Sequence, residues 1–148
     1  MAEPGGADGV SGRATTIAVV VAVVAPLVVL VGVLATRTWT PTGDQAQAEL
    51  RMLSMPEDPP LVGAAGRIED DEGRQGNHPG PLMFWSAWPV HALLGGSSWA
   101  YEAATATVFA AWTVGALLLV RRRGPPPVLV AVTAAVLLLM VGYGLEAL

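Results

Sequence analysis

The stretch AATATVFAAWTVGALLLVRRRGPPPVLVAVTAAVLLLMVGYGL, residues 103–145, decides the fold of this chain. It contains two apolar runs, 103–120 and 128–145, and its only charged residues are the three arginines of the short linker 121–127. About 20 apolar residues in a helix cross the roughly 30 Å hydrocarbon layer of a bilayer. The pattern therefore predicts two transmembrane helices, at 98–120 and 128–145, joined by a tight loop.

A third apolar run, IAVVVAVVAPLVVLVGVLA, occupies residues 17–35, and no charged residue lies between Arg13 and Arg37. It predicts another transmembrane helix at 17–36. A cleaved signal peptide is the alternative, but its apolar region is usually about 7–15 residues long and ends at a small-residue cleavage site. This run is longer, and the following LATRTW is a poor site, so an uncleaved span is the favoured interpretation.

The three arginines of the 121–127 linker set the expected orientation, because short loops rich in arginine stay in the cytoplasm. The Gly- and Ala-rich residues 1–16 are then also cytoplasmic, and we expect them to be disordered. The long loop at 37–97 faces the other side. The predicted fold class is an all-α, multi-pass integral protein of the plasma membrane, with three transmembrane helices and an extracytoplasmic loop that carries one or two surface helices.

The amino-acid composition is that of a membrane protein, and it excludes some kinds of site and partner. Hydrophobic residues make up 53% of the chain and charged residues 14%, against about 25% charged in soluble domains. The absence of cysteine excludes disulfides and thiolate metal sites, and the net charge of -4 argues against nucleic acid. Membrane lipid and another membrane protein are the expected partners.

The long loop divides into three parts. Residues 43–53, GDQAQAELRML, predict a short amphipathic helix on the membrane surface, capped by Asp44, with Ala46, Leu50 and Leu53 on one face. Residues 54–80 are rich in proline, glycine and charge and are interpreted as irregular. Residues 81–96, with their tryptophans, predict a second surface helix or a lead-in to the next span.

The order of motifs resembles a known family. A span is followed by GDQAQAEL (43–50), PLVG (60–63), NHPGPLMFW (77–85) and LLGGSSWA (93–100), which lead into another span. This order is similar to the N-terminal module of the C-type membrane glycosyltransferases, which include protein O-mannosyltransferases, aminoarabinose transferases and many actinobacterial sugar transferases. The resemblance covers roughly residues 39–120. It implies transfer of a sugar from a polyprenyl-phosphate donor to an extracytoplasmic acceptor, with no bound cofactor.

The resemblance also implies roles for individual residues. Asp44 matches the family's acidic position after the first span and would be the general base; the alternative is a helix cap. His78 matches the basic residue before the prolines and would contact the donor phosphate, with Asn77 and Arg67 as weaker candidates. As a turn histidine before a proline, His78 would have no role in chemistry.

Two further expectations remain open. The acidic run Glu69, Asp70, Asp71 and Glu72 offers oxygen ligands to a divalent cation, but such a run is more often simply solvated. Family enzymes are also several hundred residues long with more spans. The chain is therefore expected to be the N-terminal part of such an enzyme, inactive alone. The alternatives are a small membrane scaffold or accessory subunit and a membrane-anchored cation-binding protein.

Overall fold

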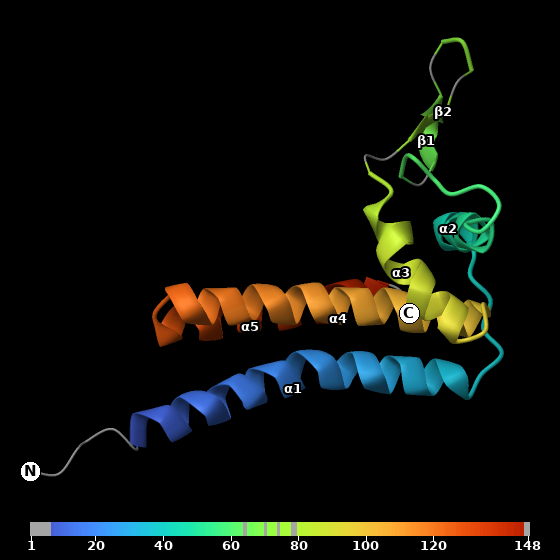
Figure 1. The fold of residues 1–148 in the computed structure, drawn as a ribbon. Helices are drawn as coiled ribbons and strands as arrows, with labels where there is room; N and C mark the ends of the chain where they lie inside the picture. Colours follow the sequence, from blue (N-terminus) through green and yellow to red (C-terminus); the bar gives the residue numbers. More distant parts are fainter. Residues whose placement is uncertain (1–6, 64, 70, 74, 78–79, 147–148) are drawn as a thin grey trace, which may run out of the picture. The chain divides into compact units, whose positions relative to one another are not determined.

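The computed structural model describes residues 7–63, 65–69, 71–73, 75–77 and 80–146. Within these residues the fold is helical apart from one short hairpin (Figure 1). The elements in chain order are α1 (Ala7–Ala35), α2 (Gly43–Leu53), β1 (Ala65–Glu69), β2 (Gln75–Asn77), α3 (Leu82–Leu93), α4 (Ser98–Arg123) and α5 (Pro126–Glu146).

Two of the three predicted spans are helices that are long and apolar enough to cross a membrane. Gly12–Ala35 of α1 and Ser98–Arg123 of α4 meet this requirement by length and composition. Only 6% and 17% of their most apolar windows are buried inside the protein, so most of their side chains face outward. That exposure is unlike the core helix of a soluble protein. The apolar part of α5, Pro126–Gly142, is shorter, so the third span remains a prediction.

Helix α1 begins earlier than expected. The prediction of a disordered segment at 1–16 is wrong for residues 7–16, which continue the helix toward its N-terminus. No proline interrupts this part of the chain, and Thr16 Oγ1 donates a 2.9 Å hydrogen bond to the carbonyl of Gly12 within the helix. Pro26 lies inside α1.

The chain forms two compact units, and the first combines residues 1–30 with 110–148. Its core consists of Val23, Leu117 and Leu129, one each from α1, α4 and α5. At one end, a Cβ added to Gly12 would come within 3.2 Å of the guanidinium of Arg121. The start of α1 therefore lies beside the end of α4 that carries the arginines, as expected if both face the cytoplasm.

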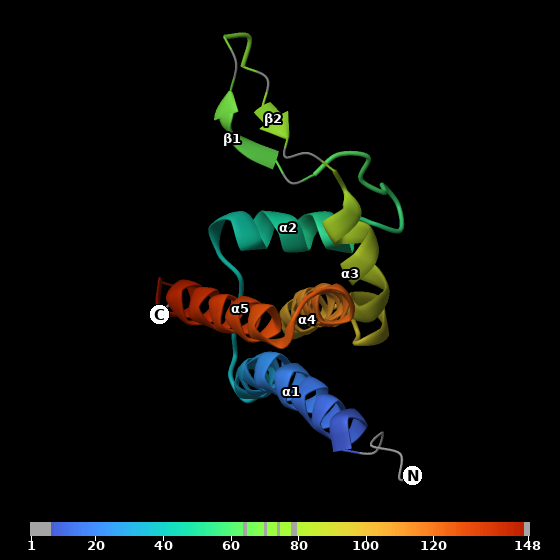
Figure 2. The ribbon, with the colours of Figure 1, turned by 90° about the vertical axis from the view of Figure 1, so that its left-hand side faces the viewer.

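The second unit, Val31–Phe109, contains the last turn of α1, the whole loop and the first turns of α4. Its core joins α2, α3 and α4; the buried members are Ala48, Met52, Met55, Phe84, Ala87, Tyr101 and Ala104. Helix α2 lies across the first turns of α4 instead of alongside them (Figure 2). An element that crosses a span in this way runs parallel to the plane of the membrane if α4 spans it.

Part of the segment interpreted as irregular, 54–80, is instead a β-hairpin. Strands β1 and β2 pair antiparallel, with Ala65 opposite Asn77 and Glu69 opposite Gln75, and a bulge between these pairs. Gly73 has a φ of 75° in the connecting turn, a conformation that glycine adopts without strain. Strands this short give little signal in a sequence rich in glycine and charge.

The second predicted surface helix is present as α3, which is separate from the following span. Gly95 and Gly96 stand between α3 and α4 with φ angles of 89° and 68°. Consecutive residues with positive φ are accessible mainly to glycine, so this pair allows the chain to turn sharply from the loop into α4.

Candidate functional site

Asp44 lies in the first turn of α2 and is exposed. The prediction that it caps the helix is wrong: the N-cap residue is Thr42, and Thr42 makes no side-chain capping hydrogen bond. Gly43, the first residue of α2, has a φ of 56°, a conformation that glycine adopts without strain. A carboxylate in the first turn is still favoured, since the positive end of the helix dipole lies there.

Helix α2 has three distinct faces, which follow from its step of about 100° per residue. Ala48, Glu49 and Met52 form the buried face. Leu50 and Leu53 lie on an exposed apolar face, together with the half-buried Ala46. The polar face carries the exposed Asp44 and Gln47 and the half-buried Arg51. The sequence indicated the apolar face and the position of Asp44 but missed the buried one.

The remaining candidates from the resemblance fall in or near the hairpin. Arg67 lies within β1 and Asn77 ends β2, but the side chains of both lie outside the described part of the structure. His78 itself is outside the described residues. The phosphate contact that the resemblance implies for His78 therefore remains a prediction.

The acidic run is spread along the same hairpin. Glu69 ends β1, Asp70 lies outside the described residues, and Asp71 and Glu72 are exposed in the turn. Among the residues that the structure describes, no group of three or more histidine, cysteine, aspartate or glutamate side chains is placed to hold a metal ion. The cation-binding alternative gains no support from this part of the chain.

The clearest polar feature of the second unit is a buried pair that the sequence did not predict. Glu49 of α2 is 8% exposed and His91 of α3 is 2% exposed, and both lie in the region of the Phe84 core. The Nε2 atom of His91 has no hydrogen-bond partner within the described chain. Most buried polar side-chain atoms in folded proteins have a hydrogen-bond partner, so His91 is an exception.

Burial lowers the pKa of His91 below its ordinary value of 6.5, because an imidazolium loses its hydration there. The nearby carboxylate of Glu49 and a hydrogen bond with the backbone of Ser97 act in the opposite direction and only partly offset the effect. His91 is therefore neutral near pH 7. A neutral imidazole beside a carboxylate can accept, hold or pass on one proton.

Local contacts keep the imidazole of His91 enclosed. A Cβ added to Gly96 would lie 3.8 Å from its Cε1 atom, and the backbone N–H of Gly96 donates a 3.0 Å hydrogen bond to the carbonyl of His91. No role in chemistry was predicted for His91 from the sequence. The sequence feature related to its burial is the Gly95–Gly96 pair, because the turn at these two glycines brings Gly96 next to the imidazole of His91.

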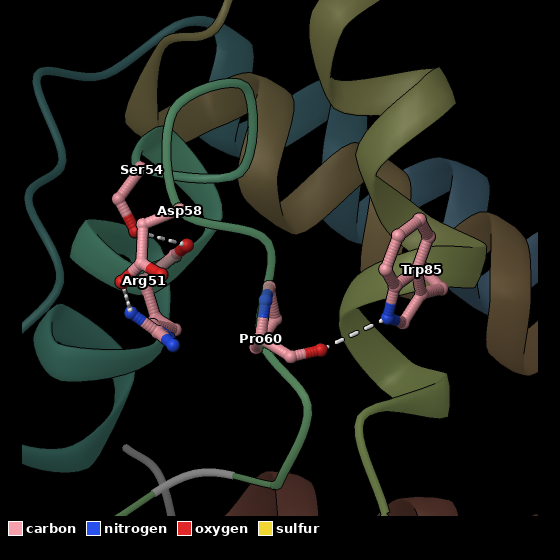
Figure 3. A network of polar contacts seen from close by, with 5 residues as sticks. All are labelled: Arg51, Ser54, Asp58, Pro60 and Trp85. Atoms are coloured by element: carbon pink, nitrogen blue, oxygen red, sulfur yellow. Dashed lines mark hydrogen bonds and ion pairs between the residues drawn. The ribbon is translucent and has the colours of Figure 1, made fainter.

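A second set of polar contacts fixes the segment that follows α2 (Figure 3). Arg51 forms a 2.7 Å ion pair with Asp58, and Ser54 Oγ donates a 2.9 Å hydrogen bond to the carbonyl of Arg51. Trp85 of α3 donates its indole N–H to the carbonyl of Pro60 at 3.1 Å. The chain is thereby held against both α2 and α3 before it enters the hairpin.

Comparison with known proteins identifies no relative: no family model, curated protein or solved structure matches the chain.

Proposed function

We propose that the chain is a multi-pass membrane protein, with α1, α4 and α5 as its spans and the 37–97 loop on the extracytoplasmic side. Support comes from the length and apolar character of α1 and α4 and from their outward-facing side chains. Arg121, Arg122 and Arg123 end α4, and their charge favours the cytoplasmic side for that end. The shorter apolar helix α5 is included because it follows these arginines directly.

We further propose that this protein is the N-terminal part of a glycosyltransferase that uses a polyprenyl-phosphate sugar. One observation carries the proposal. Asp44 is an exposed carboxylate on the polar face of α2, and α2 belongs to the same compact unit as the ends of both candidate spans. A lipid-linked donor presents its sugar at the membrane surface, so a general base for the acceptor hydroxyl is needed at this depth.

The proposed reaction assigns each group one task. The acceptor hydroxyl attacks the anomeric carbon, the bond from that carbon to the phosphate oxygen breaks, and the polyprenyl phosphate leaves with the bonding electrons. Asp44 takes the hydroxyl proton. Basic or hydrogen-bonding groups, of which His78, Asn77 and Arg67 are the candidates, stabilise the charge on the departing phosphate.

The test measures binding and transfer separately. The chain is reconstituted in nanodiscs, and native mass spectrometry compares retention of polyprenyl phosphate with that of phosphatidylglycerol at equal content. Transfer is followed in membranes of the producing cell with radiolabelled polyprenyl-phosphate sugars. We expect Asp44→Asn to retain donor binding, and in the complete enzyme to abolish transfer, because only the proton acceptor is lost.

Asp71→Asn is the matched control, since it removes an exposed aspartate of the same loop that lies in the hairpin turn. It should leave binding and transfer unchanged. Normal transfer by Asp44→Asn, or retention of polyprenyl phosphate no better than that of phosphatidylglycerol, would remove the basis of the proposal.

An accessory subunit without chemistry of its own is the second candidate. The observation that favours it is the exposure of large apolar side chains on α1, α4 and α5, for example Val28, Trp112 and Leu138. Such surfaces suit lipid and also other transmembrane helices, which pack without a hydrophobic driving force. Stable co-purification with one membrane protein, with transfer unaffected by Asp44→Asn, is the result expected for this role.

A further inference from the structure

Four exposed leucines form an apolar edge on the second unit. Leu50 and Leu53 belong to α2, and Leu93 and Leu94 stand at the end of α3; the most exposed are Leu93 at 86% and Leu50 at 67%. Leu53 Cδ2 lies 4.0 Å from a Cβ added to Gly96, two residues after Leu94, so Leu53 lies beside the turn that follows Leu94. We call these four side chains the leucine edge; its two pairs are 40 or more residues apart in sequence.

The depth of the leucine edge follows from a contact between the two candidate spans. Trp99, in the first turn of α4, donates a 2.9 Å hydrogen bond to the carbonyl of Val31 in α1. The apolar run of α1 continues for one more turn, to Ala35, which is about 6 Å further along the helix. The first turn of α4 is therefore level with apolar residues of α1, and the turn that carries Leu93 and Leu94 lies only a few residues beyond.

The direction of α2 is also suited to this depth. It lies across the first turns of α4, so it runs in the plane of the membrane (Figure 2). Its exposed surface is divided between the apolar face of Leu50 and Leu53 and the polar face of Gln47 and Arg51. A helix with this division rests at the boundary between acyl chains and headgroups.

We infer that the leucine edge is inserted among the acyl chains of the leaflet on the loop side, so that α2 and the end of α3 bind lipid. The polar face of α2, with Asp44, is then turned toward the headgroups and water. This inference rests on the membrane location proposed above, and it does not depend on the transferase activity.

The absence of cysteine makes the inference directly testable, because single labelling sites can be introduced. Leu53→Cys and Leu93→Cys carry a nitroxide label on the two elements of the edge, and Gln47→Cys carries it on the polar face of α2. Since all three positions are exposed, labelling leaves the core intact. The full chain is placed in phosphatidylcholine nanodiscs. Electron paramagnetic resonance then compares collisions with oxygen, which dissolves in acyl chains, and with a water-soluble nickel chelate.

We expect the labels at positions 53 and 93 to collide several-fold more with oxygen than with the nickel chelate, and the label at 47 to show the reverse. Access of the nickel chelate to positions 53 and 93 equal to that at 47 would show that the edge faces water and would overturn the inference. Protection of 53 and 93 from both reagents would also overturn it, because protein would then cover the edge. Donor binding is measured separately, so failure of the transferase proposal leaves these outcomes unaffected.

Discussion

The indole N–H of Trp99 donates a 2.9 Å hydrogen bond to the carbonyl oxygen of Val31, across 68 residues of sequence. This bond joins the first turn of α4 to the last part of α1 within one compact unit. The carbonyl of Val31 lies near the end of α1, and the indole N–H reaches it from outside that helix. The contact holds the last turns of α1 beside the first turn of α4.

Trp99→Phe tests the energetic weight of this contact. The variant keeps an aromatic ring but loses the donor, and a net loss of about 0.5–1.5 kcal/mol is typical for one hydrogen bond. We expect a lower midpoint of thermal unfolding, followed by tryptophan fluorescence in detergent. Trp112→Phe is the control, because Trp112 is 64% exposed and its ring should contribute little. Equal midpoints for the two variants would show that the indole bond is not a significant link.

The long helices were predictable, because α1, α4 and α5 are apolar over most of their length. The start of α1 was not predictable. The residues from Ala7 to Arg13 include two glycines and an aspartate, a composition typical of disordered segments, but they are helical and continue the span toward its N-terminus. The hairpin was missed for a similar reason. Its strands pair with each other and not with a larger sheet, so no long alternating pattern marks them.

The candidate site was predictable only in part. Asp44 could be placed on α2 from its motif, and Leu50 and Leu53 from helical spacing. The burial of Glu49 could not be predicted. Its neighbours Ala48 and Met52 form only a weak second apolar stripe on α2, and the residues that cover this stripe come from α3 and α4. His91 is about 40 residues further along the chain, so only tertiary packing brings it near Glu49.

The ion pair of Arg51 with Asp58 is close but exposed, and we expect it to contribute little. Its side chains are 36% and 71% accessible to water, and exposed pairs usually contribute about 0–1 kcal/mol. Asp58→Asn should therefore change the free energy of unfolding by less than about 1 kcal/mol. The small effect should shrink further in high salt, because salt screens exposed charges. Glu57→Gln is a suitable control, since Glu57 is an exposed acid next to Asp58.

Phe84 should matter far more. Its side chain is fully buried at the junction of α2, α3 and α4. Truncation to alanine in such a core typically costs about 3–5 kcal/mol, because transfer energy is lost and a cavity remains. Phe84→Ala should lower the unfolding midpoint strongly and expose the hairpin and α2 to limited proteolysis. Phe109→Ala, at a position 43% exposed, should be much milder. A similar loss for both variants would contradict the core assigned to the second unit.

The stability of the second unit should decrease in mild acid because of His91. Burial holds the pKa of His91 below its unfolded value of 6.5, so the unfolded chain binds the proton first as the pH falls. The free energy of unfolding is unaffected by this histidine above about pH 6.5. It decreases as the pH falls from there toward the lower pKa of the folded state. The decrease is at most about 1.4 kcal/mol per pH unit for one proton. Glu49 faces His91 from α2 and reduces this effect without reversing it.

The measurement compares unfolding midpoints between pH 7.5 and pH 5 for the native chain and for His91→Gln. The variant cannot titrate at this position, so its midpoint should fall less over the same interval, whatever the other acids and His78 contribute to both proteins. Glu49→Gln removes the opposing carboxylate and should make the acid-induced fall steeper, because the buried imidazolium then lacks its nearby negative charge. A pH dependence that is unchanged in both variants would show that His91 does not titrate as a buried imidazole beside Glu49.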